Sequence, residues 1–138
     1  MAVRLKLRVR RGSKSVDTVA LLNSGYEAPT PQLLIPTDLA KELGLWPPTQ
    51  EAIEVTLETA GGPLKAWFYP RAATTKVITE DMESKEVLVD IIVSPLANEP
   101  LISDALAEEL EIAVESFGKG LWRFRWEPKE KLRESATK

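Results

Sequence analysis

The stretch ALLNSGYEAP, residues 20–29, joins an apolar segment to a short polar loop. Residues 16–22 (VDTVALL) are rich in valine and leucine, and such a run bounded by turn residues predicts a β-strand. Asn23-Ser24-Gly25 ends the run, because small polar residues and glycine favour a tight turn. Replacing Asn23 by Asp would give this loop a carboxylate, the reactive group that it lacks as written.

The composition is that of a single globular domain. The chain has 138 residues, of which 43% are hydrophobic and 28% are charged, and its formal net charge is −3. This acidic balance argues against a nucleic-acid-binding surface. The sequence has no apolar stretch long enough to cross a bilayer and no basic leader followed by an apolar run, so we expect a cytoplasmic protein without a membrane segment.

Two residue types are missing, and their absence narrows the possible chemistry. The chain contains no Cys and no His, which excludes disulfides, zinc fingers, cysteine proteases and Ser-His-Asp triads. Acid–base catalysis is left to carboxylates, lysine and tyrosine. We therefore expect neither a metal ion nor another cofactor.

The rest of the chain is typical of short strands and two short helices. Period-2 and apolar runs predict further strands at 3–10, 32–36, 52–59, 64–69, 72–79 and 86–93. Helices are predicted at 37–44 and 104–111, with Thr37 and Ser103 as caps.

Three further features concern edges and ends. Four cations share one face of the first run, and for this face we favour a solvated sheet edge over a phosphate-binding stripe; they are Arg4, Lys6, Arg8 and Arg10. Ala60-Gly61-Gly62-Pro63 is typical of a hairpin turn that carries two glycines at its tip. Residues 127–138 are charged and weakly apolar, so we expect this tail to fray.

The sequence also contains an internal repeat. Residues 34–45 (LIPTDLAKELGL) match residues 101–112 (LISDALAEELEI) without a gap, with identity at six positions that include the leading Leu-Ile. A strand followed by a helix therefore recurs half a chain apart. We interpret this as two halves related by an approximate two-fold axis.

The order of these features resembles the retropepsin-like aspartic proteases. Leu21-Leu22-Asn23-Ser24-Gly25 is similar to the family's apolar pair followed by Asp-Thr/Ser-Gly, and Glu99-Pro100-Leu101-Ile102 is similar to its second motif, with Ser103 in place of a glycine. Residues 55–69 look like the family's flap. The resemblance implies a mainly β fold, a small closed barrel with one or two short helices and an internal pseudo-two-fold. It covers residues 1–126, followed by a charged tail.

The resemblance also implies a chemistry and a partner. Such enzymes hydrolyse peptide bonds with a water held between two carboxylates that share one proton. This chain has one such triplet, so the resemblance implies a homodimer that acts on peptides or unfolded proteins. It places Asn23, Ser24 and Gly25 in the catalytic loop, with Ser24 bonding across the dimer and Gly25 supplying backbone freedom. The implied substrate-binding residues are Tyr26, Glu27, Ala28, Ala60, Gly61, Gly62, Leu101 and Ile102.

Residue 23 departs from the family's pattern. Asn has nearly the shape of Asp but cannot act as a base, and losing a general base commonly costs ~10²–10⁴ in rate. Asp17 and Asp90 lie within strand-like runs and lack the required loop, so they do not replace it. We therefore predict an inactive chain. Either Asn23 was substituted to inactivate an aspartic endopeptidase, or the chain is a natural non-catalytic peptide-binding or dimerisation module.

A third hypothesis concerns the segment LWRFRW, residues 121–126. Trp122, Phe124 and Trp126 share one strand face and could stack on single-stranded nucleic acid. We favour a role in the core or in a subunit interface, because alternating aromatic residues near a terminus commonly pack. In retropepsin-like dimers the termini pair between subunits, which this strand would suit. We accordingly expect no nucleic-acid partner.

Overall fold

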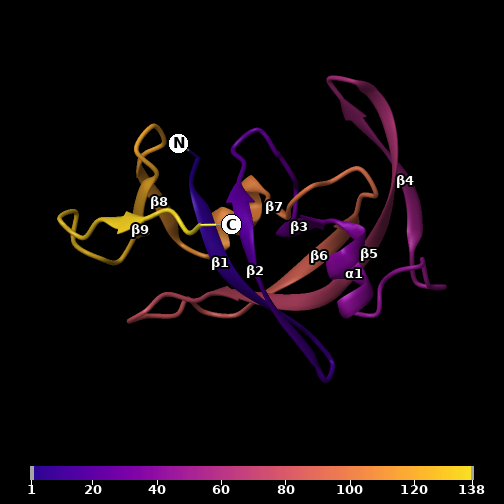
Figure 1. The fold of residues 1–138 in the computed structure, drawn as a ribbon, viewed down its shortest axis with the longest axis horizontal. Coiled ribbons are helices and arrows are strands. Elements are labelled where there is room, and N and C mark those ends of the chain that lie inside the picture. The colour runs from indigo at the N-terminus through magenta and orange to yellow at the C-terminus, as the bar shows by residue number, and fades with distance from the viewer. Residues whose placement is uncertain (1, 138) are drawn as a thin grey trace.

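Alternating apolar residues build the first strand of the sheet. In β1 (Arg4–Arg11), Leu5, Leu7 and Val9 are fully buried, and the residues between them point outward. Figure 1 shows the fold in a computed structural model that describes residues 2–137. The other strands are β2 (Lys14–Leu22), β3 (Gln32–Ile35), β4 (Ile53–Thr59), β5 (Gly62–Val77), β6 (Val87–Val93), β7 (Leu101–Ile102), β8 (Ile112–Ser116), β9 (Leu121–Phe124) and β10 (Arg133–Glu134); the helices are α1 (Thr37–Glu42) and α2 (Asp104–Glu109).

Six strands close into a barrel. They follow the order β1, β2, β7, β3, β6, β5, and β5 pairs again with β1 over residues 74–77 and 7–10. The predicted mainly β class, with a small closed barrel and two short helices, is therefore confirmed. β1 has neighbours on both sides, so the predicted sheet edge is wrong. Its outward cations form ion pairs instead: Arg4 with Glu99 at 2.9 Å, Arg8 with Asp17 at 2.8 Å and Arg10 with Glu86 at 3.1 Å.

The internal repeat is visible in the fold. The two helices begin 67 residues apart (37 to 104) and end 67 residues apart (42 to 109). The strands before them, β3 and β7, pair antiparallel with Leu34 opposite Leu101. After each helix the backbone enters the left-handed region at equivalent positions, Gly44 (φ +75°) and Glu111 (φ +62°). The sequence match thus corresponds to two copies of one strand–helix unit.

The two helices differ in how they begin. Ser103 caps α2 as predicted, because its hydroxyl oxygen accepts from the Leu106 N–H at 3.1 Å. The same oxygen also accepts from the Gln32 N–H at 3.0 Å and so ties α2 to β3. At α1 the predicted Thr37 cap is wrong: Pro36 occupies the cap position, and Thr37 is the first helical residue.

The hairpin of β4 and β5 forms an arm that extends away from the barrel (Figure 1). Thr59 faces Gly62 in the ladder, so only Ala60-Gly61 connects the strands. The predicted hairpin is confirmed, but its turn comes one residue before the glycine pair. Gly62 opens β5 with φ +109°, a conformation that glycine adopts without strain. The predicted strands at 64–69 and 72–79 both fall in β5, which has an irregular register between them.

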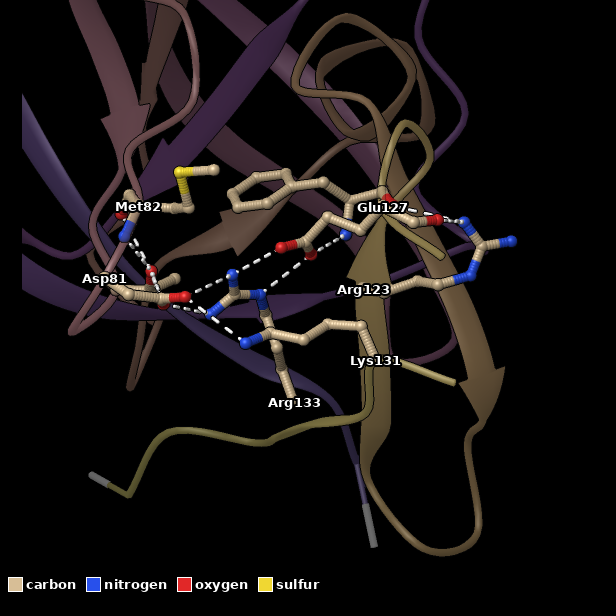
Figure 2. Close-up of polar contacts among 8 residues, drawn as sticks. Asp81, Met82, Arg123, Glu127, Lys131 and Arg133 are labelled. Atoms are coloured by element: carbon tan, nitrogen blue, oxygen red, sulfur yellow. Dashed lines mark hydrogen bonds and ion pairs between the residues drawn. The ribbon is translucent and has the colours of Figure 1, made fainter. Parts of the chain in front are cut away.

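The C-terminal residues form a second sheet, in the order β10, β9, β8, beside the barrel. Arg133 is only 9% exposed in its side chain, and its guanidinium donates to Glu127 at 2.6 Å and to Asp81 at 2.8 Å (Figure 2). Further along, the Ala136 N–H donates to the Arg4 carbonyl at 2.8 Å. The expectation that this tail frays is therefore wrong; its last residue lies outside the described part of the chain.

The aromatic residues of β9 belong mainly to the core. Trp122 is 3% exposed and Phe124 is fully buried, which confirms the core interpretation for these two residues. Trp126 lies beyond the end of β9, so the prediction that it shares the strand face of the other two is wrong; it is 49% exposed and stacks on Phe124 with ring centroids 5.0 Å apart. Because β9 pairs with β8 on one side and β10 on the other, its edges are occupied within the same chain. It is therefore not free to pair with a partner's terminus.

Candidate functional site

The loop that begins at Asn23 is positioned by two neighbouring strands. β2 runs parallel to β7, with Leu21 opposite Leu101 and Leu22 opposite Ile102. Where β2 ends, the Asn23 N–H donates to the Ile102 carbonyl at 3.2 Å and extends this pairing by one bond. The apolar pair before the loop therefore fixes where the polar residues emerge from the barrel.

A tight turn follows at once. The Tyr26 N–H donates to the Asn23 carbonyl at 3.0 Å, and the Gly25 N–H donates to Asn23 Oδ1 at 3.0 Å. A Cβ on Gly25 would lie 3.3 Å from that same oxygen, closer than most side-chain carbons approach a neighbour. Gly25 does not have a left-handed φ, so our prediction that it supplies backbone freedom is wrong. The glycine instead leaves room for the Asn23 side chain to bond the turn.

The three residues after Gly25 point in different directions. The Tyr26 hydroxyl donates to Gln32 Oε1 at 2.9 Å, and burial, together with the nearby Asp90 carboxylate, raises the pKa of this tyrosine. Tyr26 thus turns inward, contrary to the predicted cleft lining. Glu27 is exposed, whereas the Ala28 N–H points at α2 and donates to Asp104 Oδ1 at 2.9 Å.

A hollow of about 430 Å³ opens between this loop and α2. Two predicted catalytic-loop residues, Asn23 and Ser24, and one predicted substrate-binding residue, Ala28, line it. Most of its remaining wall is apolar, and the other lining residues are Leu22, Asp104, Ala105, Ala107, Glu108, Ile112 and Phe117. The Ser24 side chain is exposed, and its hydroxyl has no hydrogen-bond partner among residues 2–137.

The remaining predicted substrate-binding residues lie apart from this hollow. Ala60 and Gly61 are exposed at the tip of the arm, next to Gly62. In Figure 1 this tip and the loop between β2 and β3 both rise toward the top of the view. Leu101 is half-buried, but Ile102 is fully buried, so a direct contact of the Ile102 side chain with a peptide is corrected to a core position.

Asp104 is a residue that our sequence analysis did not select. Its Oδ1 accepts from the Ala28 N–H, and its own N–H donates to the Tyr26 carbonyl at 2.9 Å. The first helical residue of α2 therefore holds the loop at two points. Its place directly after the Ser103 cap is a signal in the sequence, but no sequence rule links it to a loop 76 residues away.

The second half of the chain contains a structural counterpart of the Asn23 turn. The Ser94 N–H donates to the Ile35 carbonyl at 3.0 Å, just as Asn23 bonds Ile102, and the Ala97 N–H donates to the Ser94 carbonyl at 3.1 Å. This second turn follows β6 and carries Ser94-Pro95-Leu96, which has neither a carboxylate nor an amide side chain. Each chain therefore offers the Asn-Ser-Gly turn once.

The two other acids that we considered are confirmed as strand residues. Asp17 lies in β2 and pairs with Arg8, which lowers the pKa of the Asp17 carboxyl chiefly through their hydrogen bonds. Asp90 lies in β6 and is 9% exposed. Over residues 2–137 we find no group of three or more acidic side chains arranged to hold a metal ion.

No protein-family model matches the chain, and no curated protein matches it. Neither helix in the described part is long and apolar enough to cross a membrane.

Proposed function

We propose that the chain is built as an aspartic endopeptidase of the retropepsin type that acts as a homodimer, and that Asn23 leaves it without its catalytic acid. The observation that supports this most strongly is the Asn23-Ser24-Gly25 turn. The Asn23 N–H donates to the Ile102 carbonyl of the parallel strand β7, and the turn lines a largely apolar hollow. An Asp at residue 23 would keep the bond that the Gly25 N–H makes, since a carboxylate oxygen accepts in the same place.

The need for a second subunit in this proposal follows from the second turn of the chain, Ser94-Pro95-Leu96. A pair of catalytic carboxylates needs two equivalent turns that face each other, but the second turn of this chain carries Ser94, which is 3% exposed and not acidic. A second copy can supply the missing turn across a two-fold axis. The unpartnered Ser24 hydroxyl then lies beside the axis, where it can donate across the interface.

Substrate binding in this proposal uses the arm. Within the described residues β4 pairs only with β5, so its outer edge offers main-chain groups to an extended peptide. The apolar side chains around the hollow would receive alternate side chains of that peptide. As written, the dimer binds such a peptide and does not cleave it, because Asn has no proton-accepting group.

Cysteine cross-linking tests the dimer directly. The chain has no Cys, so Ser24→Cys introduces a single thiol, and we expect an interchain disulfide under mild oxidation. Ser13→Cys, in the exposed turn between β1 and β2, is the matched control and should stay monomeric on a non-reducing gel. Equal cross-linking of both variants, or of neither, contradicts a two-fold axis at the Asn23 turn.

Restoring the acid tests the activity. Asn23→Asp should cleave an unfolded protein at least ~10²-fold faster than the chain as written, the gain expected from a general base. Assays should run from about pH 3 to pH 7, which spans ordinary and raised carboxylate pKa values. Asn98→Asp, at the other asparagine of the chain, makes the same chemical change in a different exposed loop and should stay inactive.

A non-catalytic peptide-binding or dimerisation module is the second candidate, and Asn23 itself favours it. In that case Asn23→Asp dimerises but stays inactive at every pH. Peptide binding by the chain as written, measured by calorimetry, then defines its function.

A further inference from the structure

A buried carboxylate outside the candidate turn joins two distant parts of the fold. Asp90 lies in β6 and is 9% exposed. Its Oδ2 accepts from the Thr30 hydroxyl at 2.5 Å, and its Oδ1 accepts from the Arg71 N–H at 2.7 Å. Thr30 belongs to the loop that starts at Asn23, whereas Arg71 lies in β5, so one side chain bridges three segments.

On the β5 side, Asp90 accepts a hydrogen bond from a main-chain N–H within a β-bulge. The register of β5 against β6 shifts between Tyr69 and Ala73, so the residues between them leave the ladder. Arg71 sits at the centre of this irregularity with φ +48°, a conformation that is unfavourable for a residue with a side chain. Its N–H would otherwise lack a ladder partner. The neighbouring Ala72 carbonyl accepts from the Arg11 guanidinium at 2.8 Å, so charged side chains hold the bulge from both sides.

The bulge divides β5 into two parts with different partners. After it, residues 74–77 pair with β1 and close the barrel. Before it, residues 67–69 still pair with β6, and residues 62–68 pair with β4, so that β5 continues from the barrel wall into the arm. Figure 1 shows β5 passing from the barrel wall into the arm without interruption. The bend at Arg71 lies two residues from the stretch of β5 that enters the arm, so a change in the backbone there is transmitted along one continuous strand.

On the loop side, Asp90 holds the end of the segment that begins at Asn23. The Asp90 carboxylate accepts from the Thr30 hydroxyl, and the Asp90 main-chain N–H donates to the Pro31 carbonyl at 3.0 Å. Thr30 Oγ1 also accepts from Gln32 Nε2 at 3.3 Å, and Gln32 Oε1 accepts from the Tyr26 hydroxyl. A continuous chain of hydrogen bonds thus leads from Tyr26, inside the candidate turn, to Asp90.

We propose that Asp90 is a positioning residue that couples the Asn23 loop to the arm, so that ordering either segment orders the other. A peptide that closes the arm would then stabilise the Asn23 turn, and the reverse holds by linkage. The use of this coupling in peptide binding rests on the proposed function. The coupling itself concerns the unliganded chain and does not depend on it.

Hydrogen exchange of the unliganded protein tests the proposal with Asp90→Asn. Asn keeps the size of Asp but has no charge and one acceptor oxygen in place of two, so it cannot reproduce the two charge-assisted bonds that Asp90 accepts from Thr30 and Arg71 on separate oxygens. We expect amides of the loop (residues 23–31) and of the arm (residues 53–69) to exchange about 10- to 100-fold faster, the factor that corresponds to losing a hydrogen bond to a charged group. Wild-type exchange in the arm overturns the proposal.

Asp104→Ala is the matched control. It removes the acceptor of the Ala28 N–H and is made both in the wild-type chain and in Asp90→Asn. With Asp90 in place, the looser loop should also speed exchange in the arm; added to Asp90→Asn, it should speed the loop and leave the arm at the rates of Asp90→Asn alone. If Asp104→Ala accelerates the arm equally in both backgrounds, the effect is general loosening and the coupling through Asp90 is wrong.

A second variant covers the case in which Asp90→Asn unfolds. Thr30→Val removes only the hydroxyl from an exposed loop residue, which touches Asp90 and not the arm. Coupling predicts faster exchange of arm amides in this variant as well, and an unchanged arm refutes it. Because exchange needs no substrate, failure of the Asn23→Asp peptidase assay leaves this result standing.

Discussion

Replacing Arg133 by Met tests how the C-terminal tail is held. The guanidinium donates to both carboxylate oxygens of Glu127, at 2.9 and 2.6 Å, and to Asp81 at 2.8 Å (Figure 2). It also lies over the rings of Trp122 and Phe124, 5.8 and 5.4 Å from their centroids. The two ion pairs differ in burial: the Glu127 side chain is 6% exposed, whereas that of Asp81 is 53% exposed.

This difference in burial sets the expected magnitude. Arg133→Met leaves the Glu127 charge buried with one remaining bond, from the Phe124 N–H at 3.0 Å. Removing one partner of a buried ion pair costs about 3–5 kcal/mol, a large part of the total of roughly 5–15 kcal/mol of a typical domain. Asp81→Asn removes only the solvent-exposed partner, whose ion pair is screened by water, and should cost far less than Arg133→Met.

Urea unfolding at pH 7 measures these free energies. The double variant Glu127→Gln with Arg133→Met should recover most of the loss, because no uncompensated charge remains and Gln can still accept from the Phe124 N–H. The reasoning is refuted if Arg133→Met costs no more than Asp81→Asn, or if the double variant is less stable than Arg133→Met alone.

The same variants predict a pH dependence. The hydrogen bonds from Arg133 lower the pKa of Glu127 below its ordinary value of 4.5, against the opposing effect of burial. A lowered folded-state pKa contributes stability that is present above pH 4.5 and is lost as the pH falls through the folded-state value. In Arg133→Met, burial dominates and raises that pKa, so the stability gap to wild type should narrow on acidification from neutral pH.

Two further substitutions test the strand–helix repeat. Glu111→Gly should raise the free energy of unfolding by about 0.5–1 kcal/mol, because glycine relieves the left-handed φ of +62° that Gly44 already accommodates in the first copy. A loss of stability in thermal unfolding contradicts this. Ser103→Ala should cost about 2–3 kcal/mol, because one fully buried hydroxyl oxygen accepts from both Leu106 and Gln32. A cost below 1 kcal/mol, typical of an exposed cap, shows that the Gln32 bond is dispensable.

The sequence alone determined the features that depend on near neighbours along the chain. Alternation predicts β1, and a run rich in valine and leucine predicts β2. The hydroxyl before α2 predicts its cap, and the match of 34–45 with 101–112 predicts two equivalent strand–helix units. The Asn23-Ser24-Gly25 turn is likewise predicted from its own residues. In each case the signal and the structure lie within a few residues, where dihedral preferences and periodicity act.

Only the tertiary structure decided which distant segments meet. β1 was expected at a sheet edge, but it pairs with β5 and forms part of the barrel wall. The C-terminal tail was expected to fray, but its Arg133 forms ion pairs with Glu127 and Asp81. In the sequence Asp90 is a single polar residue within an apolar strand, and only the fold places Thr30 and Arg71 where they donate to its carboxylate. The most distant of these contacts, that of Leu7 with Val77, joins residues 70 positions apart. The free energy of such contacts depends on burial and geometry that no local pattern encodes.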